Sequence, residues 1–189
     1  MSNPVIVEEI GRSLVVKFNR PASRSPLSID VLDILSRTVG GVDPKVAKLI
    51  FTGTANVFAS GADLREIAGI NGGDAAREFS LRGQRLMTRI AGLTCDTVAA
   101  INGFCFGGAL DLALACRGRI ASPDAVFSHP GADLGIITGW GGTQRLPRLT
   151  GEARALEMFF TAKRVDAHEA LAIGLVNAIA QDPLAAALA

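Results

Sequence analysis

The sequence predicts an α/β fold in which helices cover a sheet. Short β-branched runs alternate with segments of helical periodicity along the chain, which is the pattern of that class. Hydrophobic residues make up 49% of the chain and charged residues 20%, a composition that excludes a disordered or fibrous protein. The length of 189 residues suits one compact domain with a substantial core, so we expect residues 1–189 to form a single domain.

The first half of the chain is predicted to begin with a hairpin and to continue with alternating helices and strands. Residues 11–12 carry a turn signal between two β-branched runs. Ser28 and Asp74 stand where helix caps are expected, because apolar residues at helical spacing follow each of them. Two glycines at residues 40–41 end the first of these helices. The strands are expected at residues 5–9, 14–18, 46–51 and 97–101.

The second half of the chain continues the alternation in shorter pieces. A helix is expected to open at residues 107–108 and to end at Ala115, and another spans residues 151–161 after a glycine-rich loop. Asp166 and Glu169 form a capping-box pattern for a short helix that Gly174 terminates. The expected strands are residues 119–121, 126–127 and 175–179.

Charge and cysteine content exclude several classes of partner. The chain has 19 Lys and Arg against 18 Asp and Glu, and no segment concentrates positive charge, so we expect neither nucleic acid nor membrane as a partner. Three cysteines without C-x-x-C spacing predict no disulfide framework and no metal site, which favours a cytoplasmic location. We expect no targeting leader at residues 1–9 and no membrane span, since Asp111 interrupts the most apolar stretch.

Two glycine-rich connections are candidates for ligand contact. Residues 51–64 and 101–115 each run from a strand through small residues toward a helix. Unpaired N–H groups at a helix start, aided by the helix dipole, can receive an oxyanion or a phosphate. A tight turn explains either connection equally well when it is taken alone.

Asp111 is the unusual side chain of the second connection, because it lies within the apolar run ALDLALA at residues 109–115. Two readings stay open. The carboxylate either complements the positive end of the helix dipole or is a buried acid of an active site.

Residues 127–146 form a third glycine-rich segment, which lacks the G-K-[ST] ending of a phosphate-binding loop, so nucleotide binding is rejected. His129 and Asp133 suggest a relay, but we expect a structural hydrogen bond for His129. The other histidine, His168, is expected at the surface. Cys105, within GFCFG at residues 103–107, matches the outline of a nucleophile elbow, although its phenylalanine neighbours favour a buried thiol.

Taken together and in order, these segments resemble the crotonase, or enoyl-CoA hydratase/isomerase, superfamily. The resemblance runs from the start of the chain to Val176. It rests on NRPASRSPL at residues 19–27, FASGADL at 58–64, AING at 100–103 with the glycines at 107–108, and GGTQRL at 141–146.

The resemblance implies a spiral of ββα units, here with an abbreviated C-terminal helical region, and an acyl-CoA thioester as substrate without a further cofactor. It implies an oxyanion hole on the backbone amides of Ala62 and Gly108, and it makes Asp111 the acid/base carboxylate. The residues implied for CoA or substrate binding are Arg24, Ala62, Asp63, Leu64 and Arg65. The family also implies a role in fatty acid metabolism and assembly as a homotrimer or a dimer of trimers.

The chain departs from the family pattern at its acids. Family hydratases carry a second glutamate directly after the proline of the third segment, where this chain has Gly131, and Asp111 is one methylene shorter than glutamate. Two explanations of Gly131 stay open. The position has simply lost the acid, or its backbone has a positive φ that requires glycine. Asp133 is at most a weak substitute. Most members also continue for several helices, so either the chain is truncated or its C-terminus is short.

An enoyl-CoA hydratase/isomerase is therefore the predicted activity, with double-bond isomerisation as plausible as hydration. Two alternatives stay open. The first is a catalytically impaired acyl-CoA-binding or assembly protein, and the second is a thioester hydrolase that depends on Cys105.

Overall fold

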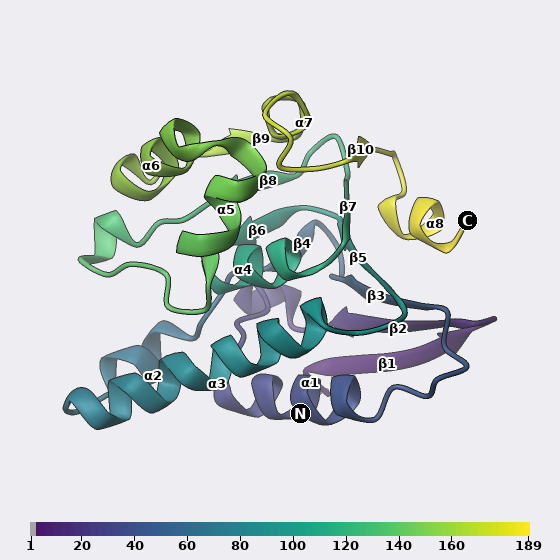
Figure 1. Ribbon diagram of the computed structural model, residues 1–189, viewed down its shortest axis with the longest axis horizontal. Helices are drawn as coiled ribbons and strands as arrows, with labels where there is room; N and C mark the ends of the chain where they lie inside the picture. Colours follow the sequence, from purple (N-terminus) through teal and green to yellow (C-terminus); the bar gives the residue numbers. More distant parts are fainter. Residues whose placement is uncertain (1–2) are drawn as a thin grey trace.

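The computed structural model describes residues 3–189, which fold into two sheets with helices packed around them (Figure 1). Residues 1 and 2, the start of the segment expected to hold no leader, lie outside the described residues. The larger sheet has the order β1-β2-β3-β5-β7-β10. Its strands are β1 (Val5–Ile10), β2 (Ser13–Phe18), β3 (Lys48–Thr52), β5 (Asp96–Ile101), β7 (Gly118–Ala121) and β10 (Ala178–Ile179).

The smaller sheet has the order β4-β6-β8-β9. Its strands are β4 (Val57–Ala59), β6 (Phe104–Phe106), β8 (Val126–Ser128) and β9 (Val165–Asp166). The helices are α1 (Ile29–Gly40), α2 (Leu64–Ala68), α3 (Gly73–Ala91), α4 (Gly108–Ala115), α5 (Gly142–Thr150), α6 (Glu152–Thr161), α7 (Ala167–Ala172) and α8 (Pro183–Leu188). Two 3-10 turns are η1 (Pro21–Ser23) and η2 (Ala132–Leu134).

The chain order confirms a succession of ββα units. β3, β5 and β7 each add a parallel strand to the larger sheet, and β4, β6 and β8 then each add a parallel strand to the smaller one. A helix follows each pair of strands: α2 with α3, then α4, then α5. The starts of these helices therefore lie beside the ends of the short strands of the smaller sheet.

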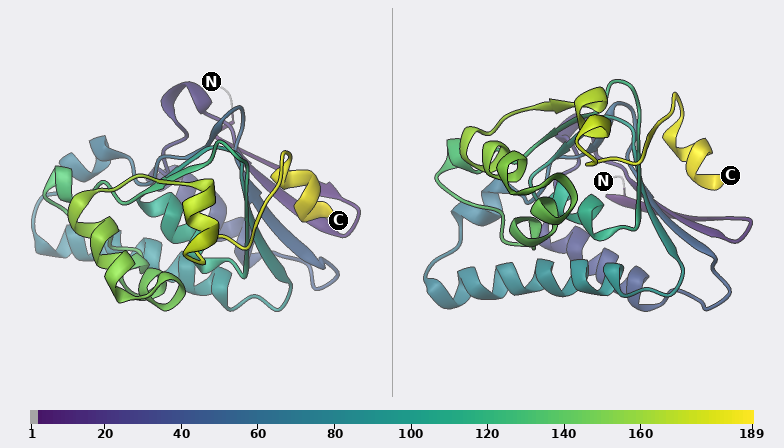
Figure 2. Two further views of the ribbon diagram at one scale, coloured as in Figure 1. Left: turned by 90° about the horizontal axis from the view of Figure 1, so that it is seen from above. Right: turned by 45° about the horizontal axis from the view of Figure 1, so that its top comes forward.

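The larger sheet is covered on both faces, as alternation along its strands requires. Val16 and Phe51 join the main core, whereas their neighbours Val15 and Ile50 pack with Ala187 of α8 in a second cluster. Figure 2 shows α1 and α3 on one side of these strands and α8 on the other.

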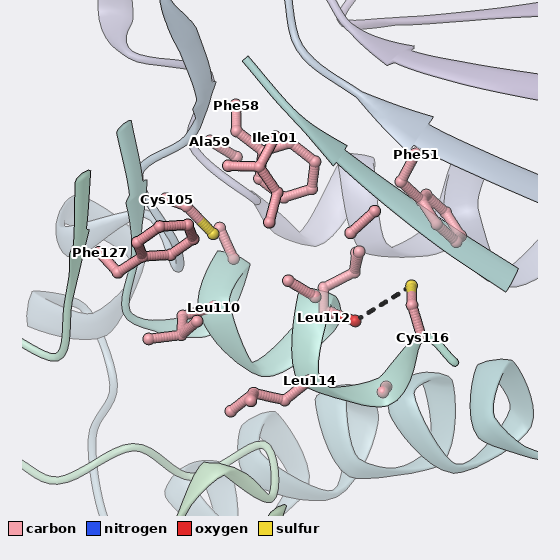
Figure 3. Packing of buried hydrophobic residues seen from close by; sticks show 14 of the residues in the cluster. Phe51, Phe58, Ala59, Ile101, Cys105, Leu110, Leu112, Leu114, Cys116 and Phe127 are labelled. Carbon is pink, nitrogen blue, oxygen red and sulfur yellow. Dashed lines mark hydrogen bonds between the residues drawn. The ribbon is translucent and has the colours of Figure 1, made fainter. Parts of the chain in front are cut away.

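Helix α4 runs through the protein interior, and all its residues from 109 to 115 are buried. A helix that is apolar on every side requires such surroundings. Figure 3 shows Leu110, Leu112 and Leu114 of this helix among side chains of both sheets. The carboxyl group of Asp111 is carried on this buried helix.

Several element boundaries differ from the sequence prediction. The prediction missed α5, because it begins in a glycine-rich segment and contains Pro147, and it missed α8, although Asp182 caps that helix by accepting from the Ala185 amide. Helix α3 begins at residue 73, one residue before the expected cap. The last strand is limited to residues 178–179, since the amides of residues 175 and 176 close the end of α7 instead.

Within residues 3–189, none of the helices combines the length and the apolar character that crossing a membrane requires.

Candidate active site

One pocket of about 270 Å³ lies between α2, α3, the start of α4 and the segment from His129 to Trp140. Its wall is mainly apolar and includes Leu64, Ile67, Ile70, Phe79, Leu134, Ile136, Ile137 and Trp140. The polar side chains in the wall are those of Ser60, Ser80, His129 and Thr138. Such a lining suits an apolar ligand that carries a small polar group at one end.

Ala62 and Gly108, the predicted oxyanion donors, line this same pocket although they come from different ββα units. The two loops touch at Gly61, where an added Cβ would lie 2.7 Å from the Gly108 nitrogen. Gly61 has a φ of +89°, so both its conformation and its surroundings require glycine. Within residues 3–189, no hydrogen bond from either the Ala62 or the Gly108 amide is found. Gly108 begins α4, where a helix leaves its amides unpaired.

Of the other residues predicted to bind CoA or substrate, only Leu64 lines the pocket. The Asp63 carboxylate accepts from the Arg65 amide and caps α2, and it also forms an ion pair of 2.7 Å with the Arg65 guanidinium. This pairing lowers the pKa of Asp63. Arg65 and Arg24 are exposed, and Arg24 has the left-handed conformation that ends η1. The structure therefore gives Asp63 a structural task.

Asp111 is fully buried and lies behind the pocket wall. The Thr138 hydroxyl donates a hydrogen bond to its Oδ2, while Oδ1 has no hydrogen-bond partner among residues 3–189. Burial raises the pKa of Asp111 from its ordinary value of 3.8 to about 7, against the opposing effects of the Thr138 hydroxyl, the Trp140 backbone amide and the positive charge of Arg145. An acid of this pKa can both accept and release a proton near neutral pH.

The Asp111 carboxylate occupies space that is free because Gly142 has no side chain. A Cβ at this position would lie 2.1 Å from Oδ1. This glycine belongs to the GGTQRL segment, so the third segment of the sequence also shapes the surroundings of the acid.

His129 was expected to make a structural hydrogen bond, and this prediction is wrong within residues 3–189. Its Nε2 is buried without a partner and lies 3.6 Å from Oδ1 of Asp111. The ring packs on Phe159, with centroids 5.0 Å apart. Burial lowers the pKa of His129 from its ordinary value of 6.5 to about 4, so the imidazole is neutral at pH 7. Sequence reasoning missed this pairing because 18 positions and two strands separate the two residues along the chain.

Gly131 has a φ of −61°, so positive φ is not the reason for its glycine. The amides of Leu134 and Ile136 both donate to the Gly131 carbonyl, and this tight turn would bring an added Cβ within 2.4 Å of the Ile136 oxygen. We expect Gly131→Glu to lower the free energy of unfolding by about 1–3 kcal/mol, measurable by chemical denaturation. An unchanged stability would show that the turn can open. Asp133 is exposed and does not line the pocket, a position that argues against its use as the second acid.

Cys105 faces the core, as Figure 3 shows, and is fully buried outside the pocket wall. Burial raises the pKa of its thiol well above the ordinary value, which opposes formation of a thiolate. These surroundings favour the buried-thiol reading over a nucleophile. His168 is exposed on α7, as expected.

The opposite pKa shifts of Asp111 and His129 cancel in the pH dependence of stability. Between about pH 4 and 6.5 the folded pair holds one proton, on Asp111, and the unfolded chain also holds one, on His129. The pair therefore contributes almost no pH dependence in this range. Two other ionisable groups interact with Asp111. The positive charge of Arg145 lowers the pKa of Asp111, and the charge of Asp111 raises the pKa of the Cys105 thiol.

Removing either partner should expose the pH dependence of the other. With His129→Gln, stability relative to wild type should fall as pH rises from 4 toward 7, because ionisation of buried Asp111 is unfavourable. With Asp111→Asn, stability should rise with pH from 4 to 6.5, because protonation of buried His129 is unfavourable. Melting temperatures across this range test the prediction, and slopes of the same sign in both variants would contradict it.

Comparison with known proteins finds a family profile and relatives that match most of the chain. A family profile described as enoyl-CoA hydratase/isomerase matches residues 11–186. The short-chain-enoyl-CoA hydratase of Clostridium acetobutylicum is 40% identical over 182 residues, which cover 95% of this chain and 69% of that protein. The crotonyl-CoA hydratase of Syntrophomonas wolfei is 39% identical over 180 residues, with coverage of 94% and 69%.

Solved structures agree with the sequence relatives. Pseudomonas aeruginosa DspI superposes with a TM-score of 0.92 at 34% identity, covering 99% of this chain and 78% of that one. An enoyl-CoA hydratase from Bacillus anthracis gives a TM-score of 0.89 at 34% identity, with coverage of 94% and 70%.

Proposed function

Because the chain belongs to the enoyl-CoA hydratase/isomerase family, we propose that it transfers a proton at the α-carbon of an acyl-CoA thioester bound in the apolar pocket. The Ala62 and Gly108 amides hold the thioester oxygen, and Asp111 holds the proton that is exchanged. The observation that supports this proposal is that Ala62 and Gly108, from separate ββα units, line one pocket, while Asp111 lies behind its wall next to His129. No cofactor beyond the CoA thioester itself is required.

The two amides act through electrostatic stabilisation. Removal of an α-proton moves negative charge onto the thioester oxygen, and fixed donors aimed at that oxygen stabilise the enolate more than the neutral thioester. Neither amide has a hydrogen-bond partner in the described part of the chain, and the close approach at Gly61 holds their loops together. The pocket wall around them is mainly apolar, which lowers the local dielectric constant and strengthens the interaction.

Double-bond isomerisation is the reaction that this set of groups supports best. One proton-holding group can take a proton from the α-carbon and return it to the γ-carbon, whereas addition of water requires a second group to activate the water. The turn at Gly131 leaves no room for a carboxylate at the position where family hydratases carry one.

A panel of CoA thioesters tests this function. Purified protein is assayed with 2-enoyl-CoA for hydration and with 3-enoyl-CoA for isomerisation, over acyl chains of increasing length. We expect turnover of 3-enoyl-CoA to exceed hydration of 2-enoyl-CoA. Faster hydration would assign the protein to the hydratases, whereas tight binding of every thioester without turnover would support the alternative of an acyl-CoA-binding or assembly protein.

We also propose that the protein assembles as a homotrimer or a dimer of trimers. Helices α5 and α6 expose Leu149, Leu156 and Phe160, and Phe160 is 75% exposed. Exposed apolar side chains close together are typical of surfaces that subunits bury. Light scattering should give a mass of three or six chains, and a monomer that persists at micromolar concentration would contradict this assembly.

A further inference from the structure

Within the described residues 3–189, two buried polar atoms without hydrogen-bond partners lie close together at the pocket wall. They are His129 Nε2 and Asp111 Oδ1, 3.6 Å apart, on side chains that are 3% and 0% exposed. A buried polar atom without a partner is costly, and two of them side by side are explained by one proton that joins them. A movement of roughly 0.5 Å brings the pair to hydrogen-bond distance.

The two side chains differ in their access to the pocket. His129 lines the pocket wall, whereas Asp111 does not. The Oδ2 atom of Asp111 is engaged by the Thr138 hydroxyl, so only Oδ1 is available for exchange. The shorter side chain of aspartate, compared with glutamate, adds to the distance between this carboxyl group and a bound thioester.

The position of the imidazole is fixed by its neighbours. His129 directly follows β8, Pro130 restricts the backbone after it, and Phe159 packs on its ring. Because Nε2 faces Asp111, the second ring nitrogen, Nδ1, is the one that can exchange a proton with a ligand.

We propose that His129 is the acid/base residue that faces the substrate and that Asp111 is its positioning partner, with one proton shared between them. This inference rests on the proposed function and refines it.

The transfer starts from the form in which Asp111 is ionised and His129 carries its proton on Nε2; the Asp111 pKa of about 7 makes this form accessible at neutral and higher pH. The α C–H bond breaks, its electron pair forms the enolate, and the proton bonds to Nδ1 of His129. At the same time the Nε2–H bond breaks and the proton bonds to Oδ1 of Asp111. The negative charge thus moves from the Asp111 carboxylate to the thioester oxygen, where the Ala62 and Gly108 amides hold it. The reverse transfer delivers the proton to the γ-carbon and completes an isomerisation without any co-reactant.

Kinetics of four proteins test this pair: wild type, His129→Gln, Asp111→Asn and the double variant, each assayed with the enoyl-CoA that wild type turns over fastest. Exposed His168→Gln is the matched control. We expect each single variant to lose about 10²-fold or more in kcat, with KM and the Kd of a saturated acyl-CoA changed less than about threefold. The double variant should lose no more than the worse single variant, because the residues act as one unit.

Chemical rescue separates proton transfer from packing. His129→Gly leaves a space beside Asp111, and added imidazole should restore part of the lost kcat in this variant but not in Asp111→Asn. Full activity of a folded His129→Gln protein, or losses that multiply in the double variant, would overturn the inference while leaving the proposed function standing. An inactive wild type that binds acyl-CoA would instead refute the proposed function itself.

Discussion

Replacing Asp111 by asparagine should reduce turnover by about 10²–10⁴-fold, the contribution of a general acid/base, while acyl-CoA affinity stays nearly unchanged. The amide keeps the shape of the side chain and can still accept from the Thr138 hydroxyl, but it cannot take up a proton. The amides of Ala62 and Gly108 belong to the backbone and survive the substitution.

The asparagine variant should also fold well. Ionised Asp111 is buried, and the shift of its pKa from 3.8 to about 7 corresponds to a cost of about 4 kcal/mol above pH 7. Asparagine removes this charge, so the melting temperature at pH 8 should not fall. Asp133→Asn, at the exposed acid nearby, is the control and should keep wild-type activity. If Asp111→Asn kept full activity, Asp111 would have no acid/base role and would only complement the helix dipole.

The second large effect is expected for Gly108→Ala. An added Cβ would lie 2.3 Å from the ring of Trp140, so either the indole or the first turn of α4 must move. Loss of one oxyanion donor costs about 10²–10³-fold in kcat, and we expect the variant to approach this loss. Overpacking should also lower the free energy of unfolding by about 1–3 kcal/mol.

Gly73→Ala is a matched control for this substitution. Gly73 is also the first residue of a helix, but a Cβ there meets no atom within 4 Å. Steady-state kinetics and thermal melts of both variants measure the comparison. If Gly108→Ala folds stably and keeps wild-type kcat, the Gly108 amide is not an oxyanion donor.

Most of the fold and part of the site could be predicted from the sequence. Alternation and helical spacing predicted the hairpin and α1, because local patterns determine these elements. Helix α5 escaped prediction, since glycine and proline residues obscure its periodicity and packing against neighbouring helices supports it instead. The resemblance of three short segments pointed to Ala62, Gly108 and Asp111, and the fold brings the first two to one pocket with the third behind its wall.

The pairing of His129 with Asp111 could not be predicted from the sequence. It depends on the fold bringing the residue after β8 next to Asp111 of α4 and on the burial of both side chains, and neither leaves a local pattern. The same limit applies to Gly131, whose glycine reflects the nearby Ile136 carbonyl rather than its own backbone angle. Asp63 shows the opposite case, because its capping pattern could have been read from the sequence as structural.

Exchange of the α-hydrogens of a saturated acyl-CoA in D₂O tests the central claim most directly, because this substrate can be neither hydrated nor isomerised. Butyryl-CoA is incubated with the protein, and NMR follows deuterium incorporation at the α-carbon. Formation of an enolate in the oxyanion hole predicts exchange with wild type that falls by about 10²-fold or more in Asp111→Asn. Saturable binding of butyryl-CoA without α-hydrogen exchange above the rate in protein-free solution would contradict the account.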